Sequence, residues 1–242
     1  MSLDDVAGYG SLSAADVAAL DAAAVASGVS VLQLMEIAGW QVARSVWRML
    51  RFASAPVVVV AGRGNNGGDG LVAARHLSAW GCTVHAVVIA ESPSELRDIV
   101  ATQLTAAENS GVHTTFATDA RAVGEALRGA TVVVDALLGT GLRGAPRVHD
   151  AAAIVAIDNA RVLAVDVPSG IDATTGEAHQ PAVRAAATCT LTAMKRGLWT
   201  ATGRAHAGAI TVADIGMPAA AWRAAGLQAP RLVRGGDLLE LG

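Results

Sequence analysis

The chain has 242 residues, of which 52% are hydrophobic and 16% charged, and its formal net charge is −3 at pH 7. This length can bury a substantial core, and the charge excludes the basic surface that nucleic-acid binding requires. No apolar stretch is long enough to span a membrane, so neither nucleic acid nor membrane is expected as a partner. Cys82 and Cys189 are isolated, and the acidic N-terminus lacks a signal pattern. These features predict a soluble, cytoplasmic protein.

Helix-like and strand-like segments alternate along the first two thirds of the chain. Residues 13–26 and 30–50 are expected to form two opening helices, with Ser13 and Ser30 as N-caps. Apolar, β-branched runs predict strands at 56–61, 82–90, 112–116, 131–135 and 161–166. Helices are expected between them, at about 70–80, 94–109, 119–128 and 149–159. This alternation predicts an α/β fold with βαβ units and a parallel sheet.

The last third of the chain is less regular. Strands are expected at 186–191 and 209–213, too close together for a full crossover helix, so they should extend the sheet at one edge. Residues 1–218 are therefore expected to form the domain. Residues 219–242 are Ala-rich and then irregular, which is consistent with a terminal helix, a linker or the stub of something longer.

The most informative segment, Gly62–Gly70, follows the first predicted strand and contains five glycines. A strand, a Gly-rich turn and a helix present backbone N–H groups to an anion. The segment lacks the Lys-Ser or Lys-Thr of an NTPase phosphate loop. Its glycines do match G-x-G-x-x-G, and Glu91 follows the next strand, so an NAD(P)-dependent dehydrogenase is a rival interpretation. Against it, we expect Asp69 in the first turn of the helix, where its carboxylate would repel a pyrophosphate.

Two later strands end in the same way, with a carboxylate and a Gly-rich turn. Asp135 and Asp166 occupy these positions, and Ser169 follows the second of them. Because the C-terminal ends of parallel strands share one edge of a sheet, we expect these strand ends to form one site. The side chains expected to meet there are Asn66, Asp69, Asp135, Asp166 and Ser169. Such oxygen ligands suit a hard cation, whereas the scattered histidines do not have zinc spacing.

The chain resembles the NAD(P)H-hydrate epimerase family, the YjeF N-terminal domain. The resemblance lies in the three strand ends, in Leu34–Gly39 of the second helix, and in Lys195–Gly197 and Ala213–Pro218. It covers roughly residues 13–218, and the Asn-Asn-Gly-Gly-Asp-Gly loop together with Asp-Val-Pro-Ser-Gly is highly specific. It implies a three-layer α/β/α sandwich, a Rossmann-like, mostly parallel sheet with two N-terminal helices, and a homodimer formed through those helices.

The resemblance also implies an activity and a site. Members of the family interconvert the R and S forms of NADHX and NADPHX, which are hydrated, damaged forms of reduced nicotinamide cofactors. The chain is therefore expected to be an isomerase of metabolite repair with a dinucleotide substrate. One K⁺ per subunit is implied at Asn66, Asp135 and Ser169. Substrate contacts are implied at Asn65, Asn66, Gly67, Gly68, Asp69, Gly139, Thr140, Gly141, Leu142, Arg143, Gly144, Ala145 and Asp166.

Asp166 and Asp69 are the candidates for proton transfer. Epimerisation needs an acid to protonate the departing hydroxyl and a base for the incoming water. A non-catalytic binding or scaffold protein on the same fold is an alternative, although such relatives usually lose the acidic loop residues that are present here. Many bacterial members are fused to a dehydratase, so a truncated bifunctional protein, with residues 219–242 as the linker, is a further interpretation.

Overall fold

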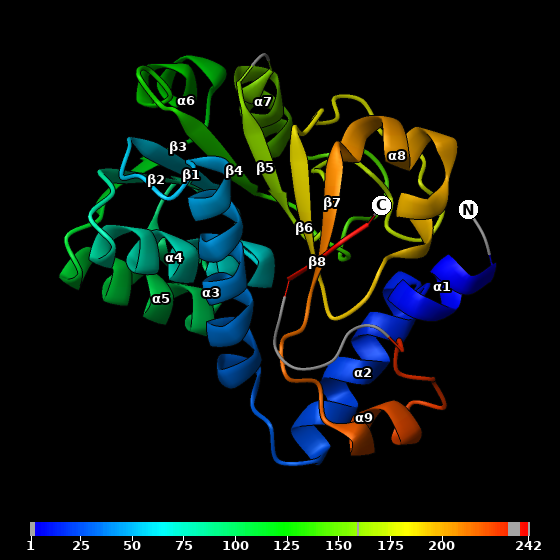
Figure 1. Cartoon of the computed structure of the whole chain (residues 1–242). Coiled ribbons are helices and arrows are strands. Elements are labelled where there is room, and N and C mark those ends of the chain that lie inside the picture. The colour runs from blue at the N-terminus through cyan, green and yellow to red at the C-terminus, as the bar shows by residue number, and fades with distance from the viewer. Residues whose placement is uncertain (1–2, 159, 232–237, 242) are drawn as a thin grey trace.

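A computed structural model describes residues 3–158, 160–231 and 238–241 of the chain (Figure 1). The helices are α1 (Leu3–Tyr9), α2 (Ala14–Ala26), α3 (Val31–Met49), α4 (Asn65–Ala79), α5 (Asp98–Asn109), α6 (Ala120–Ala126), α7 (Val148–Ile157), α8 (Ala201–Ala207) and α9 (Ala219–Ala224), with the short 3-10 helices η1 (Pro93–Glu95) and η2 (Arg196–Trp199). The strands are β1 (Val57–Ala61), β2 (Val84–Ile89), β3 (His113–Ala117), β4 (Val132–Ala136), β5 (Val162–Val165), β6 (Ala187–Leu191), β7 (Ala209–Ala213) and β8 (Leu238–Glu240). None of the helices in these ranges is both long and apolar enough to cross a bilayer.

The strands form one sheet in the order β3-β2-β1-β4-β5-β6-β7-β8. All pairs are parallel except β7 with β8, which is antiparallel. The strand order reverses at β1, which pairs with β2 on one side and with β4 on the other. In doubly wound folds such a switch point is where ligands bind, outside the C-terminal ends of the strands.

Helices cover both faces of the sheet (Figure 1). α3, α4 and α5 pack on one face, and α6 and α7 pack on the other. Along β1 the side chains alternate, so that Val57 and Val59 join the first core and Val58 and Val60 join the second. A strand buried on both faces explains the continuous apolar run in the sequence. The predicted α/β/α sandwich with a mostly parallel sheet is confirmed.

The N-terminal segment is tied to the far end of the sheet. α2 and α3 begin at Ser13 and Ser30, and both serines make capping boxes, as their sequences predict. A third, short helix, α1, precedes them and is too short to show a periodic pattern in the sequence. Between α1 and α2, Leu12 forms a parallel β-bridge with Lys195. The Leu12 N–H donates to Met194 O at 2.9 Å, so the start of the chain is fixed to the segment after β6.

The last third of the chain departs from the sequence prediction in two places. β6 and β7 are parallel neighbours at the sheet edge, as expected, but η2 and the short α8 do provide a crossover between them. In the expected tail, α9 packs against α2 through Trp222 and Leu20, and β8 adds an edge strand. Residues 232–237 of that tail lie outside the described residues.

α4 begins five residues earlier than the sequence predicts, at Asn65 instead of Gly70. The prediction was wrong because glycine has a low helix propensity, so a run of glycines indicates a loop. Here the glycines allow the helix to approach its neighbours closely. A Cβ at Gly67 would lie 1.9 Å from the carbonyl oxygen of Gly62, and one at Gly70 would lie 2.4 Å from the Cβ of Ala136 on β4. Tertiary packing therefore overrides propensity.

Gly70→Ala should lower the free energy of unfolding by about 1–3 kcal/mol, because the added methyl group meets β4 in a fully packed core. Gly124→Ala is the matched control, since a Cβ at Gly124 in α6 has nothing within 4 Å. That substitution should raise the free energy of unfolding by up to about 1 kcal/mol. Urea unfolding followed by circular dichroism measures both. Shifts of the same sign would show that Gly70 does not set the helix-to-sheet distance.

Candidate functional site

A cleft of about 850 Å³ lies at the C-terminal ends of β1, β4, β5 and β6. Residues that follow these strands line one side of it, and residues of α2 and α3, such as Asp21 and Leu34, line the other. Its volume is in the upper range for small-molecule sites. The cleft spans the switch point of the sheet, where the sequence predicts a shared site.

Most of the predicted substrate residues face this cleft. Those that line it are Asn65, Asn66, Asp69, Gly139, Thr140, Gly141, Leu142, Arg143, Ala145 and Asp166. Gly67 and Gly68 pack behind it, against Gly62 and Met35, and Gly144 is not among the lining residues. Asp135 and Ser169, the predicted cation ligands, are fully buried and do not line the cleft.

Asp166 ends β5 and forms a buried ion pair with Lys195. Its side chain is 9% exposed and that of Lys195 is 1% exposed. Asp166 Oδ1 also accepts the Leu191 N–H at 3.2 Å, and Lys195 Nζ donates to Leu191 O. The backbone of Asp166 has φ +68°, a conformation that is strained for a residue with a side chain and clusters at functional sites. The ion pair and the N–H donor together hold the carboxylate of Asp166 in one orientation.

Asp69 lines the same cleft and has a raised pKa. Burial raises its pKa well above the ordinary value, and the negative charges of Asp166 and Asp21 raise it further, although Lys195 lowers it. Burial also raises the pKa of Asp21, on α2. Its surroundings therefore favour the protonated form of Asp69. It is the fifth residue of α4 and not in the first turn, so the expected repulsion of a pyrophosphate at the helix N-terminus does not apply.

Asp135 and Ser169 form a polar cluster below the cleft. Ser169 Oγ donates to Asp135 Oδ1 at 2.6 Å, and Ser169 N donates to Asp135 Oδ2 at 2.8 Å. Burial raises the pKa of Asp135 to about 6, although these hydrogen bonds lower it. Among buried side chains of the described residues, the amide nitrogen of Asn66 is the one polar atom without a hydrogen-bond partner. That N–H group needs an acceptor and does not ligate a cation, whereas the side-chain oxygens of Asn66, Ser169 and Asp135 are ligands that suit a hard cation.

The cleft has a second, basic end. The residues there are Arg63, Arg97, Arg143 and Arg147, with Glu95 and Asp150 between them. α4 begins nearby at Asn65, and its N-cap, Gly64, provides no side-chain hydrogen bond, so the first N–H groups of the helix are available to a ligand. Cationic side chains and a helix N-terminus together form a site for phosphate groups.

Sequence reasoning did not identify several residues of the cleft. Lys195 was noted only as part of a motif, and Asp21 and Arg97 were not singled out. Arg63 stands inside the Gly-rich segment, where a cation next to a helix N-terminus was a usable signal for phosphate binding. Nothing in the sequence links Asp21, on an opening helix, to the strand ends.

Comparisons with known proteins agree with this geometry. The family model described as YjeF-related protein N-terminus matches residues 31–197. The bifunctional NAD(P)H-hydrate repair enzyme Nnr of Pyrobaculum aerophilum is 43% identical over 196 residues, which cover 79% of this chain and 38% of that protein. The NAD(P)H-hydrate epimerase of Pirellula staleyi is 40% identical over 80% of this chain and 86% of that protein. The crystal structure of yeast ynu0, YNL200c, superposes with a TM-score of 0.81 at 26% identity, over 96% of this chain and 99% of that one. The chain thus spans 38% of the length of the first bifunctional relatives.

Asp135→Asn should remove a pH dependence of stability. The folded pKa of Asp135, about 6, lies above the unfolded value of 3.8. Protonation of Asp135 therefore stabilises the folded state fully below about pH 4, and this stabilisation is lost as pH rises through about 6. Between these pH values the free energy of unfolding of the wild type should fall by up to about 3 kcal/mol relative to that of the variant.

Urea unfolding at a series of pH values in potassium-free buffer measures this difference. Asp69 also has a raised pKa, but it contributes the same pH dependence of stability to both proteins, so its contribution cancels when they are compared. Asp158→Asn, at an exposed position, should leave the wild-type profile unchanged. Parallel profiles for the wild type and Asp135→Asn would contradict the raised pKa.

Proposed function

Because the chain belongs to the family of YjeF-related N-terminal domains, we propose that it is an NAD(P)H-hydrate epimerase, interconverting the R and S forms of NADHX and NADPHX. The observation that carries the proposal is the pair of carboxyl groups in the cleft, Asp69 with a pKa raised by burial and Asp166 in an ion pair with Lys195. Two titratable groups whose surroundings separate their protonation states are the arrangement that acid–base catalysis needs. The unpaired thiols of Cys82 and Cys189 are consistent with action in the cytoplasm.

The reaction follows from the chemistry of the substrate. The reacting ring carbon bears a hydroxyl and adjoins a ring nitrogen, whose lone pair assists loss of the hydroxyl. Asp69 donates a proton to that hydroxyl, which leaves as water. The carboxylate of Asp166 stabilises the planar cation and accepts a proton from the water that adds to the other face. The proton then returns to Asp69 through solvent, so the enzyme is regenerated and only the stereocentre has changed.

Lys195 has a positioning role in this scheme. It balances the charge of Asp166, and with the Leu191 N–H it fixes which oxygen of the carboxylate remains available. Asp21 contributes a further buried carboxyl group on the opposite wall, and its negative charge helps to keep Asp69 protonated. The two carboxyl groups that transfer protons therefore have different surroundings: Asp166 is paired with Lys195, and Asp69 is buried near two other carboxyl groups.

The rest of the cleft suits a dinucleotide. With the hydrated ring at Asp166, the pyrophosphate lies over the N-terminus of α4. Arg143, on the loop after β4, lines the cleft and balances the charge of the pyrophosphate. Arg143 is oriented by hydrogen bonds to the carbonyls of Thr140 and Leu142.

A potassium ion fits the polar cluster below the cleft, and we propose Asn66, Asp135 and Ser169 as its ligands. In the described part of the chain no three His, Cys, Asp or Glu side chains are grouped as a metal site, so neutral oxygens would dominate the coordination, as K⁺ prefers. The bound ion would supply positive charge beside the floor of the cleft. It should also lower the pKa of Asp135, so the stability profile described above should flatten in KCl but not in NaCl.

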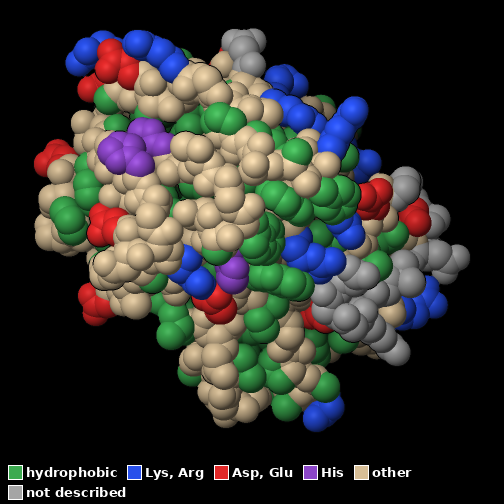
Figure 2. Space-filling model, turned by 60° about the vertical axis from the view of Figure 1, so that its left-hand side comes forward, with side chains coloured by type: hydrophobic (Ala, Val, Ile, Leu, Met, Phe, Trp, Pro, Cys, Tyr) green, Lys and Arg blue, Asp and Glu red, His purple; other side chains and the backbone are tan. Residues whose placement is uncertain are grey.

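We also propose a homodimer formed through the N-terminal helices, as the family resemblance implies. An apolar groove of about 540 Å³ on α3 is lined by Ile37 and Trp40, which are 38% and 39% exposed, and Leu32 nearby is 46% exposed. Figure 2 shows hydrophobic side chains gathered in the central and lower part of the face that contains these helices. Exposed apolar patches of this kind mark interfaces, and a second copy is the partner that the resemblance supports.

Asp69→Asn should slow epimerisation by about 10²-fold or more, because the amide cannot donate a proton to the departing hydroxyl. Folding should be intact, since the variant removes a carboxyl group whose burial is unfavourable. R/S interconversion of NADHX and NADPHX is followed by chromatography, with the uncatalysed rate in buffer subtracted. The exposed Asp158→Asn serves as control and should be fully active. Undiminished kcat in Asp69→Asn would remove this residue from the mechanism.

Trp40→Asp should convert the dimer to a monomer, because it places a charge in the centre of the proposed interface. Light scattering should give twice the 24.3 kDa chain mass for the wild type and one chain mass for the variant. Val155→Asp, at a 58% exposed position on α7 in the other helix layer, is the control and should remain dimeric. A monomeric wild type would refute the dimer.

A further inference from the structure

The basic end of the cleft extends beyond what the pyrophosphate requires. Arg63, Arg97 and Arg147 line it, together with Glu95 and Asp150. We propose that these arginines bind the 2′-phosphate on the adenosine ribose of NADPHX and make the enzyme prefer NADPHX to NADHX. The inference rests on the proposed function, because it places a dinucleotide along the cleft.

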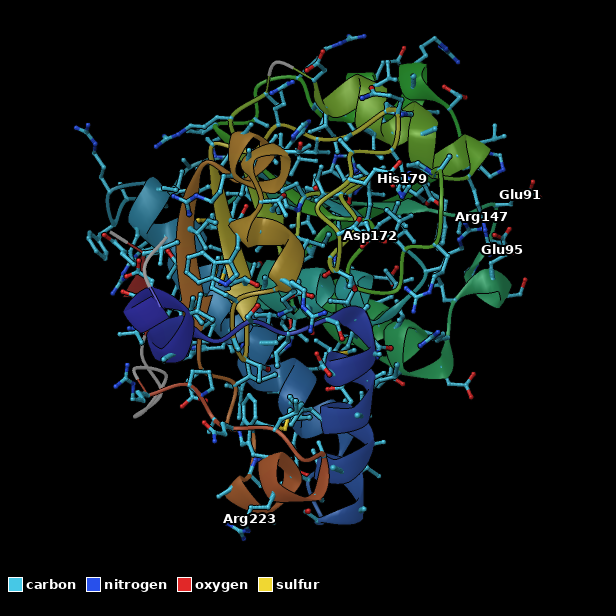
Figure 3. All side chains as sticks on the ribbon, turned by 90° about the vertical axis from the view of Figure 1, so that its right-hand side faces the viewer. Glu91, Glu95, Arg147, Asp172, His179 and Arg223 are labelled. Carbon is cyan, nitrogen blue, oxygen red and sulfur yellow. The ribbon has the colours of Figure 1, made fainter. Side chains whose placement is uncertain are left out.

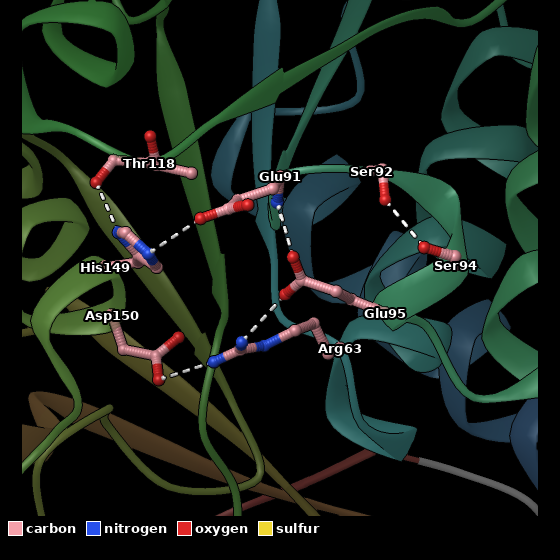
Figure 4. A network of polar contacts seen from close by, with 8 residues as sticks. All are labelled: Arg63, Glu91, Ser92, Ser94, Glu95, Thr118, His149 and Asp150. Carbon is pink, nitrogen blue, oxygen red and sulfur yellow. Dashed lines mark hydrogen bonds and ion pairs between the residues drawn. The ribbon is translucent and has the colours of Figure 1, made fainter.

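Arg63 is held in place by carboxylates on two sides (Figure 4). Its Nη1 lies 3.1 Å from Glu95 Oε2 and its Nη2 lies 3.4 Å from Asp150 Oδ2. Glu95 is fixed in turn, because its Oε1 accepts the Glu91 N–H at 3.1 Å. A guanidinium positioned in advance by fixed neighbours loses little conformational freedom when a ligand binds.

Neither Arg97 nor Arg147 forms a salt bridge with a described residue. Arg97 Nη1 donates to the side-chain oxygen of Asn65 at 3.3 Å, and Arg147 interacts electrostatically with Asp150. In Figure 3 the side chain of Arg147 lies beside those of Glu91 and Glu95 at the rim of the molecule. Among the residues that line this corner, three arginines accompany two carboxylates, Glu95 and Asp150, which leaves one net positive charge to attract a phosphate.

The fold places the adenosine at this corner. The reacting ring lies at Asp166, after β5, on one side of the switch point between β1 and β4. A dinucleotide that crosses a switch point places its other half on the opposite side, where Arg63 follows β1 and Glu95 and Arg97 follow β2. The adenosine ribose therefore lies among these charged side chains.

At this position, doubly wound folds use an acid for a ribose 2′-hydroxyl or an arginine for a 2′-phosphate. Glu91 is the acid that follows β2, but its side chain is 73% exposed, it lies 3.9 Å from His149 Nε2, and it does not line the cleft. The arginines do line it. Glu95 is the competitor within the corner, since a phosphate must replace it as the partner of Arg63.

The test uses nucleotide fragments that contain only the adenosine half. Adenosine 2′,5′-bisphosphate and adenosine 5′-monophosphate are titrated into the full chain by calorimetry. The wild type should bind the bisphosphate about tenfold or more tightly, because charge-assisted hydrogen bonds to the extra phosphate are lost with the monophosphate. Arg97→Gln together with Arg147→Gln should bring the two affinities within about twofold. Glu95→Gln should increase the preference, since it frees Arg63.

Arg121→Gln is the matched control, because Arg121 is 81% exposed on α6 and pairs only with Glu125. It should keep the wild-type preference, and circular dichroism checks that every variant is folded. The single variants Arg97→Gln and Arg147→Gln should each give an intermediate preference. Equal binding of the two nucleotides by the wild type, no measurable binding of either, or an unchanged preference in the double variant would overturn the inference.

The same proteins separate this inference from the proposed function. Under the proposal, the ratio of kcat/KM for NADPHX to kcat/KM for NADHX falls by about tenfold or more in the double variant. If the wild type accelerates neither epimerisation yet prefers the bisphosphate, the proposed function fails and the phosphate site stands. If it accelerates both equally and shows no preference between the fragments, the function stands and the phosphate site fails.

Discussion

The buried ion pair between Asp166 and Lys195 joins the end of β5 to the segment after β6, where almost no water reaches either charge. Such a pair contributes little net stability, because desolvation offsets most of the attraction, but neither partner can be removed without leaving an uncompensated buried charge. It therefore fixes geometry and charge. It anchors Asp166, whose backbone is strained, in the same cleft as the carboxyl group of Asp69. Burial is the main reason that the pKa of Asp69 is raised, and the charge of Asp166 raises it further.

One helix serves both ends of the cleft. The first residues of α4, Asn65 and Asn66, present a helix N-terminus toward the basic end, whereas Asp69, one turn later, faces the reacting end. Asp69 is the fifth residue of α4 and lies beyond its first turn, so its carboxyl group does not oppose an anion bound at that N-terminus. The same helix can therefore carry both an anion site and a candidate acid.

The sequence predicts much of the fold and part of the site. Continuous apolar strands and the carboxylates that end them are local patterns, so the parallel sheet and the grouping of Asp69 and Asp166 follow from them. The start of α4 does not, because the glycines indicate a loop until the closeness of β4 is known. The roles of Lys195 and Asp21 were also missed. Each reaches the cleft through contacts with segments distant in the chain, and no spacing rule connects residue 21 or residue 195 to a strand end.

The β-bridge between Leu12 and Lys195 also has a consequence for biosynthesis. The earliest part of the chain reaches its native position only after a segment near residue 195 has been made, because that segment supplies the edge on which it docks. Contacts between residues so far apart in sequence form late and slowly. A nascent chain on the ribosome therefore holds strands β1 to β5 before it has a closed cleft. Chains that end before this point therefore lack one wall of the cleft.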